Sequence, residues 1–182
     1  MLKENQNPPI AWPSEGSIRD FTGPWWVAHT KSRNEKAFAQ DLIVKHISYF
    51  LPMSWKVQHR HGRKIRSLLP LFGGYVFFCG GENERIEALK TNRIANIIEV
   101  KNQEKLINEL SKIELALRKG APLEPHRYIK IGQRCRVLSG SLMGLEGIVV
   151  KTKSGARLIL QVDILGQAAS VEIDTDLIEF IE

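Results

Sequence analysis

The chain has few cysteines and no long hydrophobic run. Its only cysteines, Cys79 and Cys135, lie far apart, and no second Cys or His stands at metal-ligand spacing from either. This argues against a disulfide framework or a zinc site and predicts two buried thiols in a reducing cytoplasm. No stretch approaches about 18 consecutive apolar residues, so no membrane span is expected. The first 24 residues are polar and lack the apolar core of a signal peptide, so export is not expected either.

The residue patterns of catalysis are also missing. Ser139-Gly140-Ser141 and the scattered His, Asp and Glu residues form no nucleophile–base triad and no pair of carboxylates at catalytic spacing. His59 and His61 alternate on one expected strand face, but no third ligand lies near them, so no metal site is predicted. We therefore predict a binding protein that is not an enzyme and uses no cofactor.

The charge of the chain is unevenly distributed. Its net charge is +6, with 43% hydrophobic and 25% charged residues, a composition typical of globular proteins. Residues 23–118 carry 16 Lys and Arg against 9 Asp and Glu, whereas residues 128–182 carry 6 against 7. Only the first segment is therefore expected to present a basic face to nucleic acid.

The pattern of residues 23–119 predicts an α+β sandwich in which helices cover an antiparallel sheet. Ser32-Arg33-Asn34-Glu35 resembles a capping box with Ser32 as the N-cap. Leu106, Leu110, Ile113 and Leu117 form one helical stripe. Residues 1–22 are predicted to be a mostly disordered tail. Strands are expected at residues 25–30, 49–52, 55–59, 65–69, 74–79 and 94–100, and helices from the capping box to about residue 46, at 83–90 and at 103–119.

Residues 120–127 are predicted to form a linker, because Pro122 and Pro125 interrupt helix and sheet alike. After this linker the pattern changes to five short strands separated by turn residues, which predicts a small closed five-stranded β-barrel over residues 128–182. Its β-rich alternation favours strands over helices as the resting form. The strands are expected at residues 133–138, 146–151, 156–164, 168–173 and 177–181.

Both halves carry motifs of one known family. Trp25-Trp26-Val27, the capping box and Pro70-Leu71-Phe72-Gly73-Gly74-Tyr75-Val76-Phe77 resemble the N-terminal domain of the NusG family of transcription factors. The glycine-spaced segments at residues 132–147 and 162–166 look like its C-terminal SH3-like KOW barrel. The two matches follow in order over residues 24–182. The resemblance implies an elongation factor that binds RNA polymerase and suppresses pausing and termination.

The resemblance also implies a contact surface for the polymerase. In NusG-type factors an apolar concavity grips the coiled coil on the clamp of the largest subunit, a task that suits aromatic side chains. The expected contacts in this chain are His29, Phe72, Gly73, Tyr75 and Phe77. Strand alternation also allows Phe77 to be a plain core residue. Gly73 stands where the family usually has Pro, which loosens the turn.

Residues 55–66 contain five Lys or Arg, two His and no acidic residue. Such a loop suits contact with phosphates of non-template DNA or nascent RNA near the transcription bubble. The alternative is a solvated basic turn that serves solubility. If the chain has the family's geometry, Lys31, Arg33 and Arg93 border the same face. The nucleic-acid candidates are Lys31, Arg33, Arg60, His61, Arg63, Lys64, Arg66 and Arg93.

In the second segment, Ile164 and Leu165 precede Gly166 at the point where the family docks Rho or a small-subunit ribosomal protein. The alternative is one core residue and one turn residue. The Pro-Leu-Phe lead-in and the compact loop before it look more like specialised RfaH or UpxY-type paralogues, which act on selected operons. A general NusG factor and a KOW protein that binds RNA or ribosomes without a polymerase role remain the alternatives. A cytoplasmic monomer without membrane contact is expected.

Overall fold

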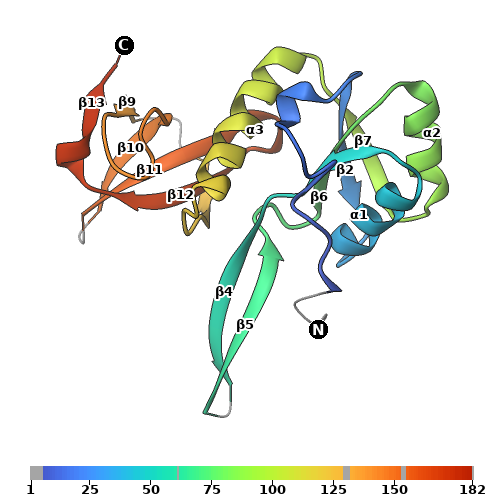
Figure 1. The fold of residues 1–182 in the computed structure, drawn as a ribbon, viewed down its shortest axis with the longest axis horizontal. Helices are drawn as coiled ribbons and strands as arrows, with labels where there is room; N and C mark the ends of the chain where they lie inside the picture. Colours follow the sequence, from blue (N-terminus) through green and yellow to red (C-terminus); the bar gives the residue numbers. More distant parts are fainter. Residues whose placement is uncertain (1–5, 61, 129–131, 153–154, 182) are drawn as a thin grey trace. The chain divides into compact units, whose positions relative to one another are not determined.

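The computed structural model describes residues 6–60, 62–128, 132–152 and 155–181, the side chain of Arg60 excepted. The chain divides into two compact units, Met1–Gln103 and Glu104–Glu182. The first contains a sheet with helices, and the second is mainly β (Figure 1). Within the described residues, no helix is long and apolar enough to cross a bilayer.

The first unit is built on a five-stranded antiparallel sheet of order β1-β3-β6-β2-β7. Two of its three inner strands, β6 and β2, pair Phe77 with Val27 and Cys79 with Trp25. All four of these side chains are buried, as expected for apolar runs in the interior of a sheet. The strands are β1 (Ala11–Trp12), β3 (Ser48–Phe50), β6 (Tyr75–Cys79), β2 (Trp25–Thr30) and β7 (Ile94–Glu99).

Two helices of this unit are α1 (Glu35–Val44) and α2 (Glu82–Lys90). The expected capping box is wrong, because Asn34 is the N-cap of α1 and makes no side-chain capping bond. Arg33 has a left-handed φ of 58°, which places Ser32 in a turn before the helix. The core against these helices consists of Ala28, Phe38, Ala39, Leu42, Ile47, Tyr49, Leu51, Met53, Val76, Phe78 and Ala88.

The expectation of a disordered tail is wrong for residues 6–22. Strand β1 pairs Ala11 with Phe50 and Trp12 with Tyr49, and the hydroxyl of Tyr49 donates to the carbonyl of Pro9 at 2.8 Å. Ile18 is buried. The apolar residues here are isolated in sequence and show no period. Their pairing with the edge of a distant strand could therefore not be predicted from the local sequence. Residues 1–5 lie outside the described residues.

Strands β4 (Met53–Arg60) and β5 (Arg63–Pro70) form a separate two-stranded antiparallel sheet, the hairpin that projects from the first unit in Figure 1. At its base the amide of Leu71 donates to the carbonyl of Pro52 at 2.9 Å. The ammonium of Lys36 on α1 donates to the carbonyl of Leu68 at 2.5 Å. Both strands were predicted, and both are longer than expected.

The second unit begins at the second residue of α3 (Gln103–Arg118), whose Leu106, Leu110 and Ile113 are buried as the stripe predicted. The division after residue 103 groups this helix with the strands that follow, whereas the sequence placed the boundary near residue 120. The six strands, in sheet order, are β13 (Ile178–Phe180), β9 (Gln133–Val137), β10 (Glu146–Thr152), β11 (Gly155–Val162), β12 (Gln167–Ile173) and β8 (Glu124–Arg127).

Strand β8 corrects the expectation that residues 120–127 are all linker. It pairs with β12 at the end of the sheet, where Pro125 lies opposite Ala169. Proline is tolerated there because an edge strand does not need every amide for pairing. Among the described residues the pairings form one series from β13 to β8 and do not close a ring. The β-rich character of this segment is as predicted.

Candidate functional site

The first candidate surface begins at the turn from Phe72 to Tyr75. The amide of Tyr75 donates to the carbonyl of Phe72 at 3.1 Å, and Gly74 has a φ of 85°, the geometry of a type II turn. The amide of Gly74 donates to the carboxylate of Glu35 at 2.6 Å. Its carbonyl accepts from the amide of Thr30 at 2.8 Å. The turn is therefore fixed to α1 and β2 at once.

The turn places an aromatic pair at the end of the inner strands. His29 of β2 lies opposite Tyr75 of β6, and their rings stack with centroids 4.9 Å apart and planes 22° apart. His29 is exposed and Tyr75 is half-buried. A Cβ atom at Gly74 would lie 3.4 Å from the imidazole of His29, so the turn approaches this ring closely. We call His29 and Tyr75 the aromatic pair.

Phe72 and Phe77, also predicted to contact the polymerase, are buried with 1% and 0% of their surface exposed. Their rings meet edge to face with centroids 6.3 Å apart, and the centroid of the Phe77 ring also lies 6.5 Å from that of the Phe50 ring. Their placement agrees with the alternative in which Phe77 belongs to the core. Gly73 is exposed. Of the five predicted contacts, the aromatic pair and Gly73 therefore lie at the surface.

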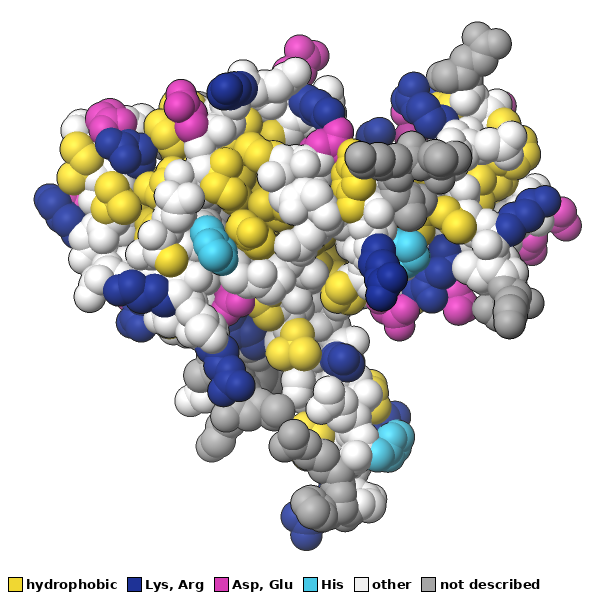
Figure 2. Space-filling model, turned by 180° about the vertical axis from the view of Figure 1, so that it is seen from behind, with side chains coloured by type: hydrophobic (Ala, Val, Ile, Leu, Met, Phe, Trp, Pro, Cys, Tyr) yellow, Lys and Arg dark blue, Asp and Glu magenta, His cyan; other side chains and the backbone are white. Residues whose placement is uncertain are grey.

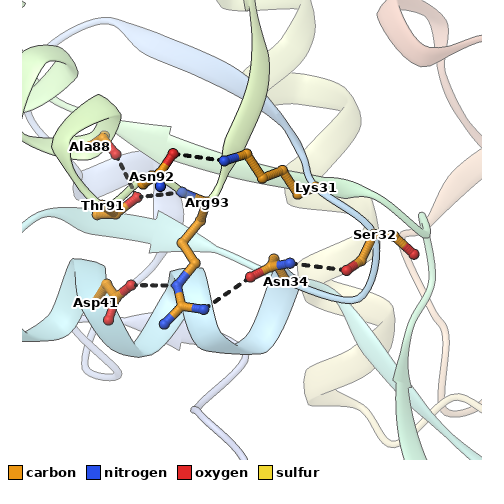
Figure 3. A network of polar contacts seen from close by, with 8 residues as sticks. All are labelled: Lys31, Ser32, Asn34, Asp41, Ala88, Thr91, Asn92 and Arg93. Carbon is orange, nitrogen blue, oxygen red and sulfur yellow. Dashed lines mark hydrogen bonds and ion pairs between the residues drawn. The ribbon is translucent and has the colours of Figure 1, made fainter.

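Two predicted nucleic-acid residues, Lys31 and Arg93, meet where two turns join the sheet to its helices (Figure 3). Arg33 lies in the first of these turns. The guanidinium of Arg93 donates to Asp41 at 2.9 Å and to Asn34 at 3.0 Å. Arg93 therefore uses its charge to join the start of β7 to α1.

Lys31 is held in the same network. Its ammonium donates to Asn92 at 2.7 Å, and its amide donates to the carbonyl of Arg93 at 2.8 Å. Arg33 is exposed beside it. Sequence reasoning missed Asn34, Asp41 and Asn92, because their partners lie about 50 to 60 residues away and no local pattern marks them.

The hairpin brings most of its cations to the surface. Trp55, Val57 and His59 of β4 lie opposite Leu68, Arg66 and Lys64 of β5, so these six side chains share one face. We call them the hairpin face. Figure 2 shows hydrophobic and basic side chains side by side along this projection.

Arg63 and Lys64 are exposed near the end of the hairpin. Arg60 pairs with Arg63 through the backbone, and His61 lies outside the described residues. The guanidinium carbon of Arg66 lies 4.7 Å from the centroid of the Trp55 ring, a cation–π contact that the sequence did not reveal.

In the second unit, Ile164 and Leu165 are half-buried in a single 3-10 turn, Asp163–Leu165, that ends at Gly166 with a φ of 58°. The turn replaces the end of the strand expected over residues 156–164. Residues of helix α3 contact Asp163 and so hold this turn in place. The sequence alone did not show these contacts.

The carboxylate of Asp163 accepts from the hydroxyl of Tyr128 at 3.0 Å and forms an ion pair with Lys105. Its amide donates to Glu109 at 3.1 Å. Burial raises the pKa of Glu109 to about 7. Burial alone would raise the pKa of Asp163 too, but the hydrogen bonds from Lys105 and Tyr128 hold it below its usual value.

Metal and thiol chemistry have no support in the described residues. They contain no group of three or more His, Cys, Asp and Glu that could hold a metal ion. Cys79 and Cys135 are free and buried, as predicted, and burial raises the pKa of both thiols, that of Cys79 to about 11. Thiols of this kind are poor nucleophiles at neutral pH.

The chain thus consists of a mixed α/β unit, which carries the aromatic pair and a cation-rich hairpin, followed by a unit that is mainly β. A family model described as "Transcription termination factor nusG" matches residues 23–115, and the chain belongs to the NusG family. Members of this family are transcription factors rather than enzymes, as the sequence predicted.

No curated protein matches the chain. Among solved structures, it is similar to NusG of Thermotoga maritima, from a study of domain interaction, with 17% identity and a TM-score of 0.45 over 87% of this chain and 97% of that one. It is also similar to a chain of the MjSpt4:Spt5 complex, with 14% identity and a TM-score of 0.28 over the same shares. At these values neither likeness gives a role to any residue.

Proposed function

We propose that this chain is a transcription elongation factor that docks on RNA polymerase through the aromatic pair and suppresses pausing and termination. The observation that carries the proposal is the His29–Tyr75 stack, with His29 exposed and Tyr75 half-buried, within the segment matched by the NusG family model. Such a pair offers a large, rigid contact area at low entropic cost, which suits a grip on the coiled coil of the polymerase clamp.

Docking there would act through conformational equilibrium, without chemistry. A factor that bridges the polymerase cleft disfavours the opened or swivelled states that precede pausing, but only by its difference in affinity for the two states. Arg63 and Lys64 support a contact with DNA or RNA phosphates beside the bubble, since both are exposed. The second unit binds Rho or a ribosomal protein through Ile164 and Leu165. Because both units belong to one chain, a docked factor holds this second binding surface at high effective concentration near the polymerase.

We further propose that the factor is a specialised cytoplasmic antiterminator that acts as a monomer on selected operons. The Pro70-Leu71-Phe72 lead-in supports this role over that of a general factor. Chromatin occupancy of the tagged protein tests the choice. Recruitment to a few long operons supports specialisation, whereas coverage of all polymerase-bound genes indicates the general factor.

A polymerase pull-down with the full chain tests the docking surface. We expect Tyr75→Ala to weaken binding by about 30-fold, the loss of one interface hot spot of about 2 kcal/mol. Tyr75→Phe keeps the ring and should retain most of the affinity. Phe180→Ala, at an exposed aromatic of the second unit, is the matched control.

Equal binding by Tyr75→Ala and wild type would overturn the proposed docking surface. If the wild-type chain itself fails to bind polymerase but binds RNA or ribosomes, the alternative of a KOW protein without a polymerase role is correct.

A further inference from the structure

We propose that the hairpin face holds one unpaired nucleotide by stacking its base on Trp55. This site rests on the proposed nucleic-acid contact of the hairpin and goes beyond it, because it recognises a base rather than phosphates alone. Trp55, the third residue of β4, is 41% exposed, although tryptophan side chains are normally mostly buried. Its ring is therefore available to a partner.

Arg66 holds the ring of Trp55 in one orientation. Its guanidinium carbon lies 4.7 Å from the ring centroid, so the cation covers one part of the indole and restrains its rotation. Arg66 itself remains exposed. A base that stacks on Trp55 therefore meets an oriented ring, and the adjoining phosphate meets a cation already in place.

The surroundings of Trp55 select a nucleic acid over an apolar protein surface. Lys64 lies two positions from Arg66 on the same face, and residues 53–70 contain five Lys or Arg and no Asp or Glu. Val57, 45% exposed, is the next residue after Trp55 on this face, lies opposite Arg66 and adds apolar contact. Aromatic rings flanked by cations are the means by which proteins bind single strands without sequence preference.

The geometry of a strand sets how many bases this face holds. Side chains on one face of β4 repeat at about 7 Å, twice the 3.4 Å rise of a stacked strand. Neighbouring positions therefore cannot engage successive stacked bases. The only indole of the face belongs to Trp55, and the imidazole of His59 lies four residues further along β4. A base within a duplex presents no free face, so the site takes a splayed base from single-stranded DNA or RNA.

The experiment measures the affinity of the full chain for labelled oligo-dT and oligo-rU of about 12 nucleotides, and for a DNA duplex of the same length, by fluorescence anisotropy across salt concentrations. Trp55→Ala should weaken single-strand binding by about 5- to 100-fold and leave duplex binding within about 2-fold. Trp55→Phe should recover most of the loss. Leu69→Ala removes an equally exposed apolar side chain from the opposite face and should change nothing.

The salt dependence of the single-strand affinity distinguishes base stacking on Trp55 from the phosphate contact on which this proposal rests. Trp55→Ala should keep the wild-type slope of log affinity against log salt, because stacking releases no counterions. The Arg60→Ala, Arg63→Ala, Lys64→Ala triple variant should flatten that slope whether or not Trp55 stacks.

Single-strand affinity unchanged by Trp55→Ala, or equal losses on single strand and duplex, overturns the stacking site. A loss confined to oligo-dT or to oligo-rU identifies the strand that is bound. If Trp55→Ala lowers only polymerase capture, the face binds protein and the proposal is wrong. A wild-type chain that binds no oligonucleotide at any salt concentration refutes the nucleic-acid contact itself.

Discussion

The contact between α3 and the turn at Asp163 makes the second unit sensitive to pH near neutrality, and Glu109→Gln tests this sensitivity. The carboxylate of Glu109 accepts the amide of Asp163 at 3.1 Å, and only 16% of its side chain is exposed. An amide side chain accepts the same hydrogen bond through its oxygen but carries no charge to bury. The variant therefore removes the titration while it keeps the contact.

The magnitude follows from the pKa of Glu109, which burial raises from its ordinary 4.5 to about 7. Between these two values the folded chain holds a proton that the unfolded chain has released, so the free energy of unfolding falls as pH rises through this window. The full difference corresponds to about 3 kcal/mol. We expect Glu109→Gln to stabilise the second unit by about 2 to 3 kcal/mol at about pH 8 and to change little at about pH 4.

Amide NMR of the second unit provides the measurement. The wild-type Asp163 amide should shift with a midpoint near 7, and the shift should vanish in Glu109→Gln. Urea unfolding followed on second-unit amides gives the stability difference at both pH values. Glu104→Gln, the same change at an exposed position of α3, is the control. A midpoint near 4.5, or a Glu109→Gln stability gain that does not depend on pH, would refute the reasoning.

Two further predictions concern the turn beside the aromatic pair. Gly73 occupies the second position of a type II turn from Phe72 to Tyr75, where proline is preferred, so Gly73→Pro should stabilise the first unit by about 0.4–1 kcal/mol. A fall in the melting temperature would show that the backbone of Gly73 does not accept proline. Glu35→Ala removes the acceptor of the Gly74 amide and should destabilise this unit by about 1–3 kcal/mol, with faster amide exchange at Gly74. Glu35→Gln keeps an acceptor oxygen and should lose less stability. Amide exchange at Gly74 that is as slow in Glu35→Ala as in the wild type would contradict the hydrogen bond from Gly74 to Glu35.

Elements with a strong local pattern were predictable from the sequence. The apolar run of β6 and the leucine stripe of α3 both lie within one or two residues of their predicted bounds. The hairpin strands were also predicted, since β-rich residues flank a glycine-containing turn. These elements depend on periods that a window of ten to eighteen residues contains.

Features that depend on distant partners were not predictable. Strand β1 has only two residues and exists because Phe50 and Tyr49 offer an edge to pair with. Strand β8 contains a proline that local rules exclude from a sheet interior and that an edge permits. The ion pair of Arg93 with Asp41, which belongs to another element, was not predicted. In each case the deciding contact forms only after the chain has folded.

The isolation of the hairpin has a kinetic consequence. Among the described residues, β4 and β5 pair only with each other, so one ladder alone orders the outer part of the hairpin. A two-stranded ribbon is marginally stable by itself and opens locally at small free-energy cost. A ligand that needs the ordered hairpin must supply that cost, and weaker net binding appears mainly as faster dissociation. We expect contacts on this hairpin to break and re-form rapidly, which lets a strand slide past it while the rest of the factor stays bound.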